Sequence, residues 1–276
     1  MKKAIQKTVL SFTDDFPGLS GVNIMERAYP IEPFLVITEF RMSRPVFGPH
    51  PHAGISVMTY MLPDSQTGFI NRDSNGDHST IEPGGLHITQ AGKGIHHDEY
   101  PEKKGSMAHG FQIWINHAEK DRLAEPKAMH AAAQEVPEIE TADYRVRIIH
   151  GHFGGKTPAY KLLTAVTLLH VFLHADKSIT LPAEAMAFIY GLNGSGTSGN
   201  TLFSAQNLLN FDTKGDFVQI NAGENGCELL FGTGMPLGEQ IVYGGPFVAT
   251  TPEQMAEMRR RYGRGEMGTL LPHEKP

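Results

Sequence analysis

Four side chains in two short segments have the types and the spacing to bind a metal ion. His50 and His52 are two residues apart, and so are His97 and Glu99. Residues i and i+2 of a strand point to the same side, so each pair offers two ligand atoms in one direction. Pro51 disfavours helical backbone at His50 and keeps that segment extended. Three imidazoles and one carboxylate suit a borderline divalent cation such as iron, manganese, cobalt, nickel, copper or zinc, and we expect these residues to hold one ion.

The second pair has an alternative in the same strand. His96 and Asp98 are also two residues apart and would offer the same ligand types on the opposite face. The chain contains 14 histidines, so one His-x-His spacing is weak evidence by itself. Two such pairs, each beside a glycine-containing corner, make a metal site the better interpretation, but spacing alone leaves the register of the second pair open.

Further histidines occur in the second half of the chain, at His150, His152, His170 and His174. His170 and His174 would share one face of a strand, which makes a second metal site conceivable. No ligand pair follows at the later position, where residues 218–222 stand. We therefore expect these four histidines to have structural roles.

The segment after His52 is predicted to form one wall of the site. Residues 53–62 read as a strand with apolar residues on both faces, typical of a sheet that is covered on both sides. If no bulge intervenes, its even-numbered positions share the parity of the two histidines. The expected substrate pocket beside the metal therefore contains Ser56, Met58 and Tyr60.

Composition sets limits on the function. The 276 residues carry a net charge of −6, which argues against the basic surface that nucleic-acid binding requires. Cys227 is the one cysteine, so no internal disulfide is expected and a reducing, cytoplasmic location is favoured. The N-terminal segment lacks the apolar run of an export signal or a membrane span. We expect no nucleic-acid or membrane partner, and a monomer or weak homo-oligomer.

Many short strands must position these residues. The chain has 30 glycines and 18 prolines spread along its length, and turns recur about every ten residues, as in barrels and sandwiches. Asn75-Gly76 predicts a hairpin, and corners are also expected at Asn193–Gly196 and Asn225-Gly226. The rhythm appears in both halves, which predicts two related barrels, residues 1–143 and residues 144–276.

Helix signals are concentrated near the C-terminus. Thr251 can cap a helix, Pro252 suits its first position, and Gln254 would complete a capping box. This helix is expected to run to about Tyr262 and to close at Gly263. Residues 118–125 have helical composition, and residues 127–143 are interpreted as connecting structure.

Several motifs together resemble the pirin family of bicupins. The resemblance extends over most of the chain, and the segments that carry it are His50–Gly54, Pro83–His87, Gln90–Glu99, Gly110–Asn116 and Tyr243–Val248. It implies an all-β fold of two tandem cupin barrels, with a metal, commonly Fe(II), in the first barrel only. The family's ligands fall on His50, His52, His97 and Glu99, which favours His97 over His96.

The resemblance also implies a function. Some pirins are similar in activity to quercetin 2,3-dioxygenases, which cleave a flavonol ring with dioxygen, and Glu99 would then be both a ligand and the general base. The substrates would be a small aromatic molecule such as a flavonol, and O2. Eukaryotic pirins instead act through partners in transcription, which is the alternative for this chain. Pirins often have arginine and glutamate where this chain has Ala53 and Ser56, a difference that bears on substrate preference.

Overall fold

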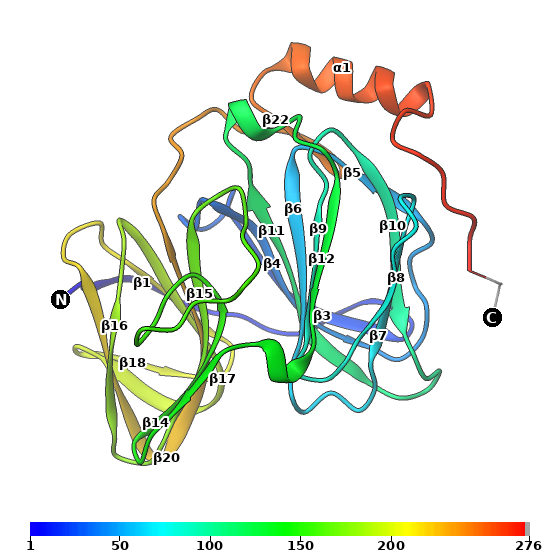
Figure 1. The fold of residues 1–276 in the computed structure, drawn as a ribbon. Coiled ribbons are helices and arrows are strands. Elements are labelled where there is room, and N and C mark those ends of the chain that lie inside the picture. Colours follow the sequence, from blue (N-terminus) through cyan, green and yellow to red (C-terminus); the bar gives the residue numbers. More distant parts are fainter. Residues whose placement is uncertain (274–276) are drawn as a thin grey trace.

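Apolar segments punctuated by glycine and proline turns form strands throughout the protein. The computed structural model describes residues 1–273, and its strands form two barrels that lie side by side (Figure 1). The predicted fold class is confirmed: the protein is all-β, with two tandem barrels and a short C-terminal helix.

The first barrel consists of two sheets. The larger sheet contains, in spatial order, β12 (Lys127–Ala131), β9 (Leu86–Gln90), β6 (Ile55–Met61), β11 (Ala108–Asn116), β4 (Phe34–Met42), β3 (Leu19–Met25) and β2 (Thr13–Phe16). The smaller sheet contains β5 (His50–His52), β10 (Ile95–Pro101), β7 (Phe69–Asp73) and β8 (His78–Ile81). The predicted Asn75-Gly76 hairpin joins β7 to β8, which pair antiparallel.

The second barrel is one extended sheet. Its spatial order is β1 (Ala4–Val9), β19 (Asn207–Phe211), β17 (Met186–Ser198), β20 (Phe217–Gly234), β15 (Val166–Leu173), β14 (Tyr144–His150) and β13 (Glu138–Glu140). Two further strands pair with it, β16 (Ser178–Pro182) with β20 and β18 (Thr201–Ser204) with β17. A separate hairpin of β21 (Val242–Gly244) and β22 (Phe247–Ala249) precedes helix α1 (Pro252–Gly263).

Two of the predicted corners in the second half are β-bulges. Asn193–Gly196 lies inside β17 and Asn225-Gly226 lies inside β20, and these two strands pair with each other. The register shifts between Gly191 and Asn193 and again between Gly194 and Gly196. A bulge bends a strand without ending it, so the same glycine signal indicates a corner or a bend.

Two segments cross the predicted boundary between residues 143 and 144. β1 pairs with β19 and therefore adds the start of the chain to the second barrel. At the other end, α1 packs with β21 and β22, and Phe247 bridges Ala53 of the first barrel. Figure 1 shows α1 beside the end of the first barrel that carries β5. The division of the chain at residue 143 stays a prediction. β1 and the segment around α1 each contact the barrel to which this division does not assign them.

Helix α1 has the predicted bounds and a modified cap. The Thr251 hydroxyl accepts a hydrogen bond from the Gln254 backbone N–H at 3.2 Å, as expected of an N-cap. The Gln254 Oε1 atom, however, accepts from the backbone N–H of Thr250 at 2.9 Å and not from that of the cap residue. The predicted helix at residues 118–125 is wrong, since only the single 3-10 turn Glu119–Asp121 forms there.

The stretch interpreted as connecting structure contains two strands. β12 pairs with β9 of the first barrel, and β13 pairs with β14 of the second. Both strands lie at the edges of their sheets, where composition is a weak guide to strand formation. Residues 127–143 therefore extend both barrels in addition to joining them.

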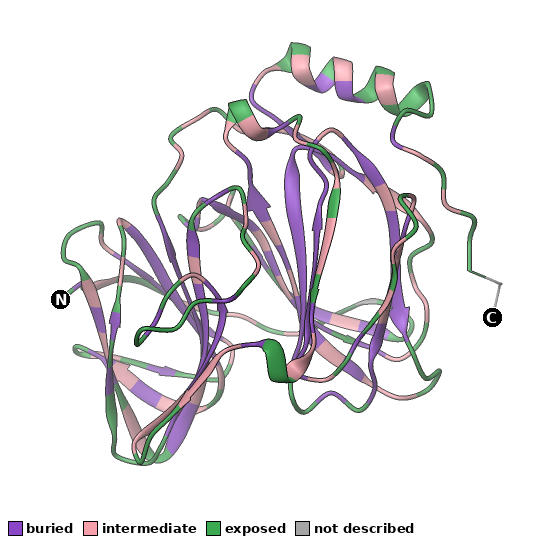
Figure 2. Ribbon diagram, viewed as in Figure 1, coloured by how far each residue is buried: buried purple, intermediate pink, exposed green. Residues whose placement is uncertain are grey.

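Buried apolar residues fill the space between the barrels as well as the second barrel. One cluster contains Met58 and Tyr60 of β6 together with Phe188 and Tyr190 of β17. All seven residues of β6 are buried, as expected for a sheet covered on both faces. Figure 2 shows buried residues along the strands and exposed residues in most of the connecting loops. Within residues 1–273, no helix has the length and apolarity to cross a membrane.

Candidate metal centre

Two neighbouring strands bring the predicted ligands together. β5 and β10 pair antiparallel, with His97 directly opposite His50 and Ile95 opposite His52. Residues directly opposite each other point to the same face, so His97 lies on the histidine face of β5. Glu99 is two residues further along β10 and has the same orientation.

The three imidazoles form a tight cluster. One ligand nitrogen from each of His50, His52 and His97 lies within 4.8 Å of the other two. The ring centroids are 5.0 Å apart for His50 and His52, 4.7 Å for His50 and His97, and 4.9 Å for His52 and His97. Among the described residues this is the one group of three or more candidate ligands.

The alternative register places its residues elsewhere. The His96 ring stacks on Tyr262, and its Nδ1 lies 3.3 Å from the carbonyl oxygen of Met267. Asp98 forms an ion pair with Arg72, whose Nε lies 2.9 Å from Asp98 Oδ1. Both side chains are therefore engaged on the opposite face of β10, away from the imidazole cluster.

The free nitrogens of the cluster fit a metal ion. Nδ1 of His50 donates to the carbonyl oxygen of Gly48 at 2.9 Å, and Nδ1 of His52 donates to that of Pro246 at 3.3 Å. These bonds leave Nε2 of each ring as the ligand atom. Nε2 of His52 and both nitrogens of His97 are buried and have no hydrogen-bond partner in the described part of the chain. A cation would satisfy these nitrogens, since buried polar groups are nearly always paired.

Burial keeps these imidazoles neutral. Desolvation lowers the pKa of His50, lowers that of His52 to about 3, and holds that of His97 well below its usual range. The nearby imidazoles add to the effect at His52 and His97. Neutral imidazole is the form that binds metals, so no proton has to be displaced near neutral pH.

Glu99 is buried beside the cluster and held by two donors. Its Oε1 accepts from the Thr59 hydroxyl at 2.5 Å, and its Oε2 accepts from the Gln112 amide at 2.7 Å. Burial raises the pKa of Glu99 to about 7, against the opposing effect of these two hydrogen bonds. The carboxylate is not part of the group of ligand atoms within 4.8 Å of one another. Its predicted role as the fourth ligand stays a prediction.

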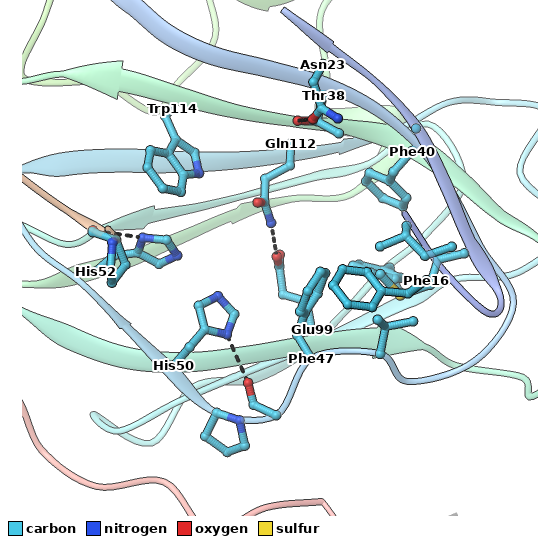
Figure 3. A pocket seen from close by; sticks show the side chains of 18 of the residues that line it. Phe16, Asn23, Thr38, Phe40, Phe47, His50, His52, Glu99, Gln112 and Trp114 are labelled. Carbon is cyan, nitrogen blue, oxygen red and sulfur yellow. Dashed lines mark hydrogen bonds between the residues drawn. The ribbon is translucent and has the colours of Figure 1, made fainter. Parts of the chain in front are cut away.

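An open cavity leads to this centre. Its volume is about 970 Å³, within the range of small-molecule sites. Figure 3 shows His50, His52 and Trp114 on one side, Glu99 and Gln112 in the middle, and Phe16, Phe40 and Phe47 on the other side of Glu99. The remaining lining residues are Leu19, Gly21, Asn23, Thr38, Met42, Val46, Gly48, Pro49, Phe69, Gly245 and Pro246.

The predicted substrate pocket was wrong in its residues. Ser56, Met58 and Tyr60 do not line the cavity. Met58 and Tyr60 pack in the core between the barrels, and the Ser56 hydroxyl lies 2.8 Å from Nε2 of His117. The odd-numbered face of β6 points toward the centre instead, as the bond from Thr59 to Glu99 shows.

A glycine explains the change of parity. Ala53 and Gly54 separate β5 from β6, and Gly54 has a φ of +80°. This left-handed backbone breaks the alternation of faces, so parity does not carry over from His52 to β6. A Cβ at Gly54 would lie 1.9 Å from the carbonyl oxygen of Val248, so the corner also requires glycine. The glycine is visible in the sequence, whereas the close approach of Val248 is not.

The histidines of the second half have hydrogen-bond partners. His170 Nε2 donates to Glu228 Oε1 at 2.8 Å, so its Nδ1 accepts from the Tyr60 hydroxyl at 3.0 Å. Nδ1 of His150 lies 2.8 Å from the carbonyl oxygen of Val166. His152 and His174 contact Thr157 and a backbone carbonyl, respectively. These contacts agree with structural roles for the four residues.

Sequence comparisons match both halves of the chain. Residues 26–115 match the sequence model of a family described as Pirin, and residues 168–268 match one described as the Pirin C-terminal cupin domain. A pirin-like protein of Arabidopsis thaliana is 34% identical over 240 residues, which cover 82% of this chain and 76% of that protein. A Vibrio cholerae protein, provisionally named a quercetin 2,3-dioxygenase, is 28% identical over 250 residues, which cover 86% of this chain and 87% of that protein.

Solved structures support the same fold. A quercetin 2,3-dioxygenase from Acinetobacter baumannii superposes with a TM-score of 0.88 at 23% identity, and the match covers 98% of this chain and 100% of that one. The pirin YhhW from Escherichia coli in complex with nickel(II) superposes with a TM-score of 0.65 at 19% identity, covering 84% of this chain and 100% of that one. Together with the match to the Pirin C-terminal cupin domain, these superpositions support a fold of two cupin barrels.

Proposed function

The chain belongs to the pirin family, and on this premise we propose that it is a metal-dependent dioxygenase that cleaves a flavonol-like substrate with O2. The observation that carries the proposal is the open cavity of about 970 Å³ that ends at the imidazole cluster. A purely structural metal site needs no such access, because its ligands close around the ion. The relative provisionally named a quercetin 2,3-dioxygenase supports the same choice.

The proposed ligands of one divalent cation are His50, His52, His97 and Glu99. Iron(II) is the metal that the resemblance favours, and the three neutral nitrogens also accept manganese, cobalt, nickel, copper or zinc. With one carboxylate, a divalent ion retains a charge of about +1. When bound, it would supply a Lewis-acidic centre that favours the deprotonated hydroxyl of a flavonol and brings this substrate together with dioxygen.

Glu99 is suited to move the substrate proton. A general base works best when its pKa is close to the working pH, and burial raises the pKa of Glu99 to about 7. Thr59 and Gln112 hold its two oxygens, so the carboxylate is oriented before the substrate arrives. In the proposed reaction the carboxylate of Glu99 accepts the proton of the flavonol hydroxyl.

The cavity walls are suited to bind an aromatic molecule and to exclude water. Apolar side chains surround the part of the cavity away from the histidines, and such walls bind an aromatic body while displacing solvent. Trp114 packs edge-on against His52, with ring centroids 5.0 Å apart, and limits the movement of that ligand.

Aerobic turnover of quercetin tests this function. The protein is loaded in turn with iron(II), manganese(II), cobalt(II) and nickel(II), and the flavonol absorption band is followed in air and under argon. We expect loss of the band only in air, and no loss with a His97→Ala variant. The partner-binding alternative predicts that the metal binds while the band persists with every metal, and that result would refute the dioxygenase proposal.

A further inference from the structure

We propose that Phe16 and Phe47 form an aromatic clamp at the mouth of the cavity, which selects ligands with a planar body of more than one ring. The inference rests on the proposed function, because it concerns the same cavity. Both rings line the cavity, and they contact each other edge-to-face with centroids 5.5 Å apart and an interplanar angle of 82°.

The two rings of the pair present an exposed apolar surface. Phe16 is 49% exposed and Phe47 is 45% exposed, although both are large apolar side chains. Single exposed apolar residues need no explanation, but two aromatic rings that meet at the mouth of a cavity form a patch typical of ligand binding. Figure 3 shows the two rings together on the side of the cavity away from His52 and Trp114.

The two rings belong to segments that are hydrogen-bonded to each other. Phe16 ends β2, and Phe47 lies in the loop between β4 and β5. Nε of Arg44 in that loop donates to the carbonyl oxygen of Pro17 at 2.7 Å, and the backbone N–H of Ser43 donates to that of Gly18 at 2.9 Å. These bonds tie the residues that follow Phe16 to the loop that carries Phe47, three and four residues before that ring.

The loop that carries Phe47 also orients a proposed metal ligand. The carbonyl oxygen of Gly48, the next residue, accepts the hydrogen bond from Nδ1 of His50 at 2.9 Å. The rings of Phe47 and His50 have centroids 6.3 Å apart. Phe47 therefore lies next to a proposed metal ligand, within reach of a molecule bound at the imidazole cluster.

The chemistry of the lining limits the ligand further. The lining also includes the apolar side chains of Phe40, Phe69, Leu19 and Met42, and its polar side chains are those of Asn23, Thr38, His50, His52, Glu99 and Gln112. Among the described residues, those that line the cavity include no lysine or arginine. No cationic side chain is therefore available for a phosphate or a second carboxylate. The ligand class is a largely apolar, fused or linked aromatic with one metal-binding oxygen group.

Anaerobic binding to the metal-loaded protein tests the clamp. The probes are quercetin and a one-ring 3-hydroxy-4-pyranone, which share the chelating hydroxyl and carbonyl but differ in their aromatic body. Binding is followed by the absorption change of each probe under argon for the wild type, Phe16→Leu, Phe47→Leu and the double variant. Leu202→Ala is the control, since Leu202 is 60% exposed on β18 of the other barrel.

We expect each leucine substitution to weaken quercetin binding by roughly fivefold to tenfold, in line with the strength of an aromatic contact. Binding of the one-ring probe should change by less than about twofold, and Phe47→Tyr should restore the wild-type preference because the ring is retained. An equal loss for both probes, unchanged quercetin binding in the double variant, or no preference in the wild type would each overturn the clamp. Since no oxygen is present, a failure of the dioxygenase reaction does not affect these outcomes.

Discussion

At the scale of single residues, hydrogen bonds orient the side chains of the site. They hold the rings of His50 and His52 and the carboxylate of Glu99. The sequence predicted that His50 and His52 share one face, because a period of two on a strand puts side chains on the same side. By spacing alone, the sequence left His96 and His97 as alternatives, and the resemblance to the pirin family favoured His97, which the structure places in the cluster. The sequence could not reveal Thr59 and Gln112, which hold Glu99 from two other strands. Gln112 lies in the segment Gly110–Asn116, but no pattern in that segment indicates a contact with Glu99, and the role of both residues arises from the register of β6 and β11.

Gln112 offers a direct test of this support. A Gln112→Leu variant removes the donor to Oε2 of Glu99, so the pKa of Glu99 should rise above about 7. We expect metal affinity at pH 7.5, measured by calorimetry, to fall roughly 10- to 100-fold, as for other residues that orient ligands. Gln219→Leu, in β20 of the second barrel, is the matched control. Equal affinities for the two variants would show that Gln112 does not act on Glu99.

At the scale of elements, regular segments could be predicted and their irregular joins could not. The hairpin at Asn75-Gly76 and helix α1 lie where their sequence patterns predict them. The join between β5 and β6 was misread, because parity was carried through Gly54. The bulges in β17 and β20 were predicted as corners. A glycine indicates unusual backbone, but it does not distinguish a bulge within a strand from a turn between two strands.

Gly54 should be intolerant of a side chain. A Gly54→Ala variant places a Cβ in a left-handed position, 1.9 Å from the carbonyl oxygen of Val248. We expect a loss of roughly 3–5 kcal/mol in the free energy of unfolding, the sum of backbone strain and overpacking. Gly105→Ala is the control, since Gly105 has a φ of +84° but no atom within 4 Å of its added Cβ. That variant should lose only about 1–2 kcal/mol by urea denaturation. Equal losses would show that the contact with Val248 has no role.

At the scale of the whole molecule, the cavity is assembled from parts of the chain that no local pattern connects. Its walls include Phe16 near the start, Phe47 in a loop, and Gly245-Pro246 near the end of the chain. The carbonyl oxygen of Pro246 accepts a hydrogen bond from His52, so the C-terminal hairpin takes part in orienting a proposed ligand. The contact from Pro246 exists because the C-terminal hairpin packs on the first barrel, while the N-terminal strand β1 pairs in the second. No pattern in the amino-acid sequence indicated this arrangement.

A buried polar network joins the two barrels and should make stability depend on pH. Tyr190 of the second barrel donates to Oε2 of Glu39 at 2.6 Å, and Nε2 of His109 donates to Oε1 of Glu39 at 2.9 Å. Burial opposes charge on His109, but the hydrogen bond to Glu39 and the charge of Asp64 outweigh it and raise the pKa of His109. A raised pKa in the folded state stabilises the fold below the unfolded value of about 6.5, and the gain is lost as pH rises through the folded value.

His109→Gln isolates this charge, because glutamine can still donate a hydrogen bond to Glu39. We expect the variant to be less stable than the wild type at pH 5.5 by on the order of 1 kcal/mol, the difference between a charged and a neutral hydrogen bond. At pH 9 the difference should shrink. Urea denaturation at both pH values measures it, with His152→Gln as the control. A difference that grows with pH would contradict the assigned sign.

We propose that three imidazoles from two paired strands, with Glu99 beside them, hold one divalent cation. Calorimetric titration of the metal-free protein with nickel(II) or anaerobic iron(II) tests it most directly, applied to the wild type, His52→Ala, His97→Ala and the control His152→Ala. We expect the wild type and the control to bind one ion per chain, and the other two variants to bind it with an affinity at least about 100-fold weaker. One ion bound with unchanged affinity by His52→Ala and His97→Ala would contradict it.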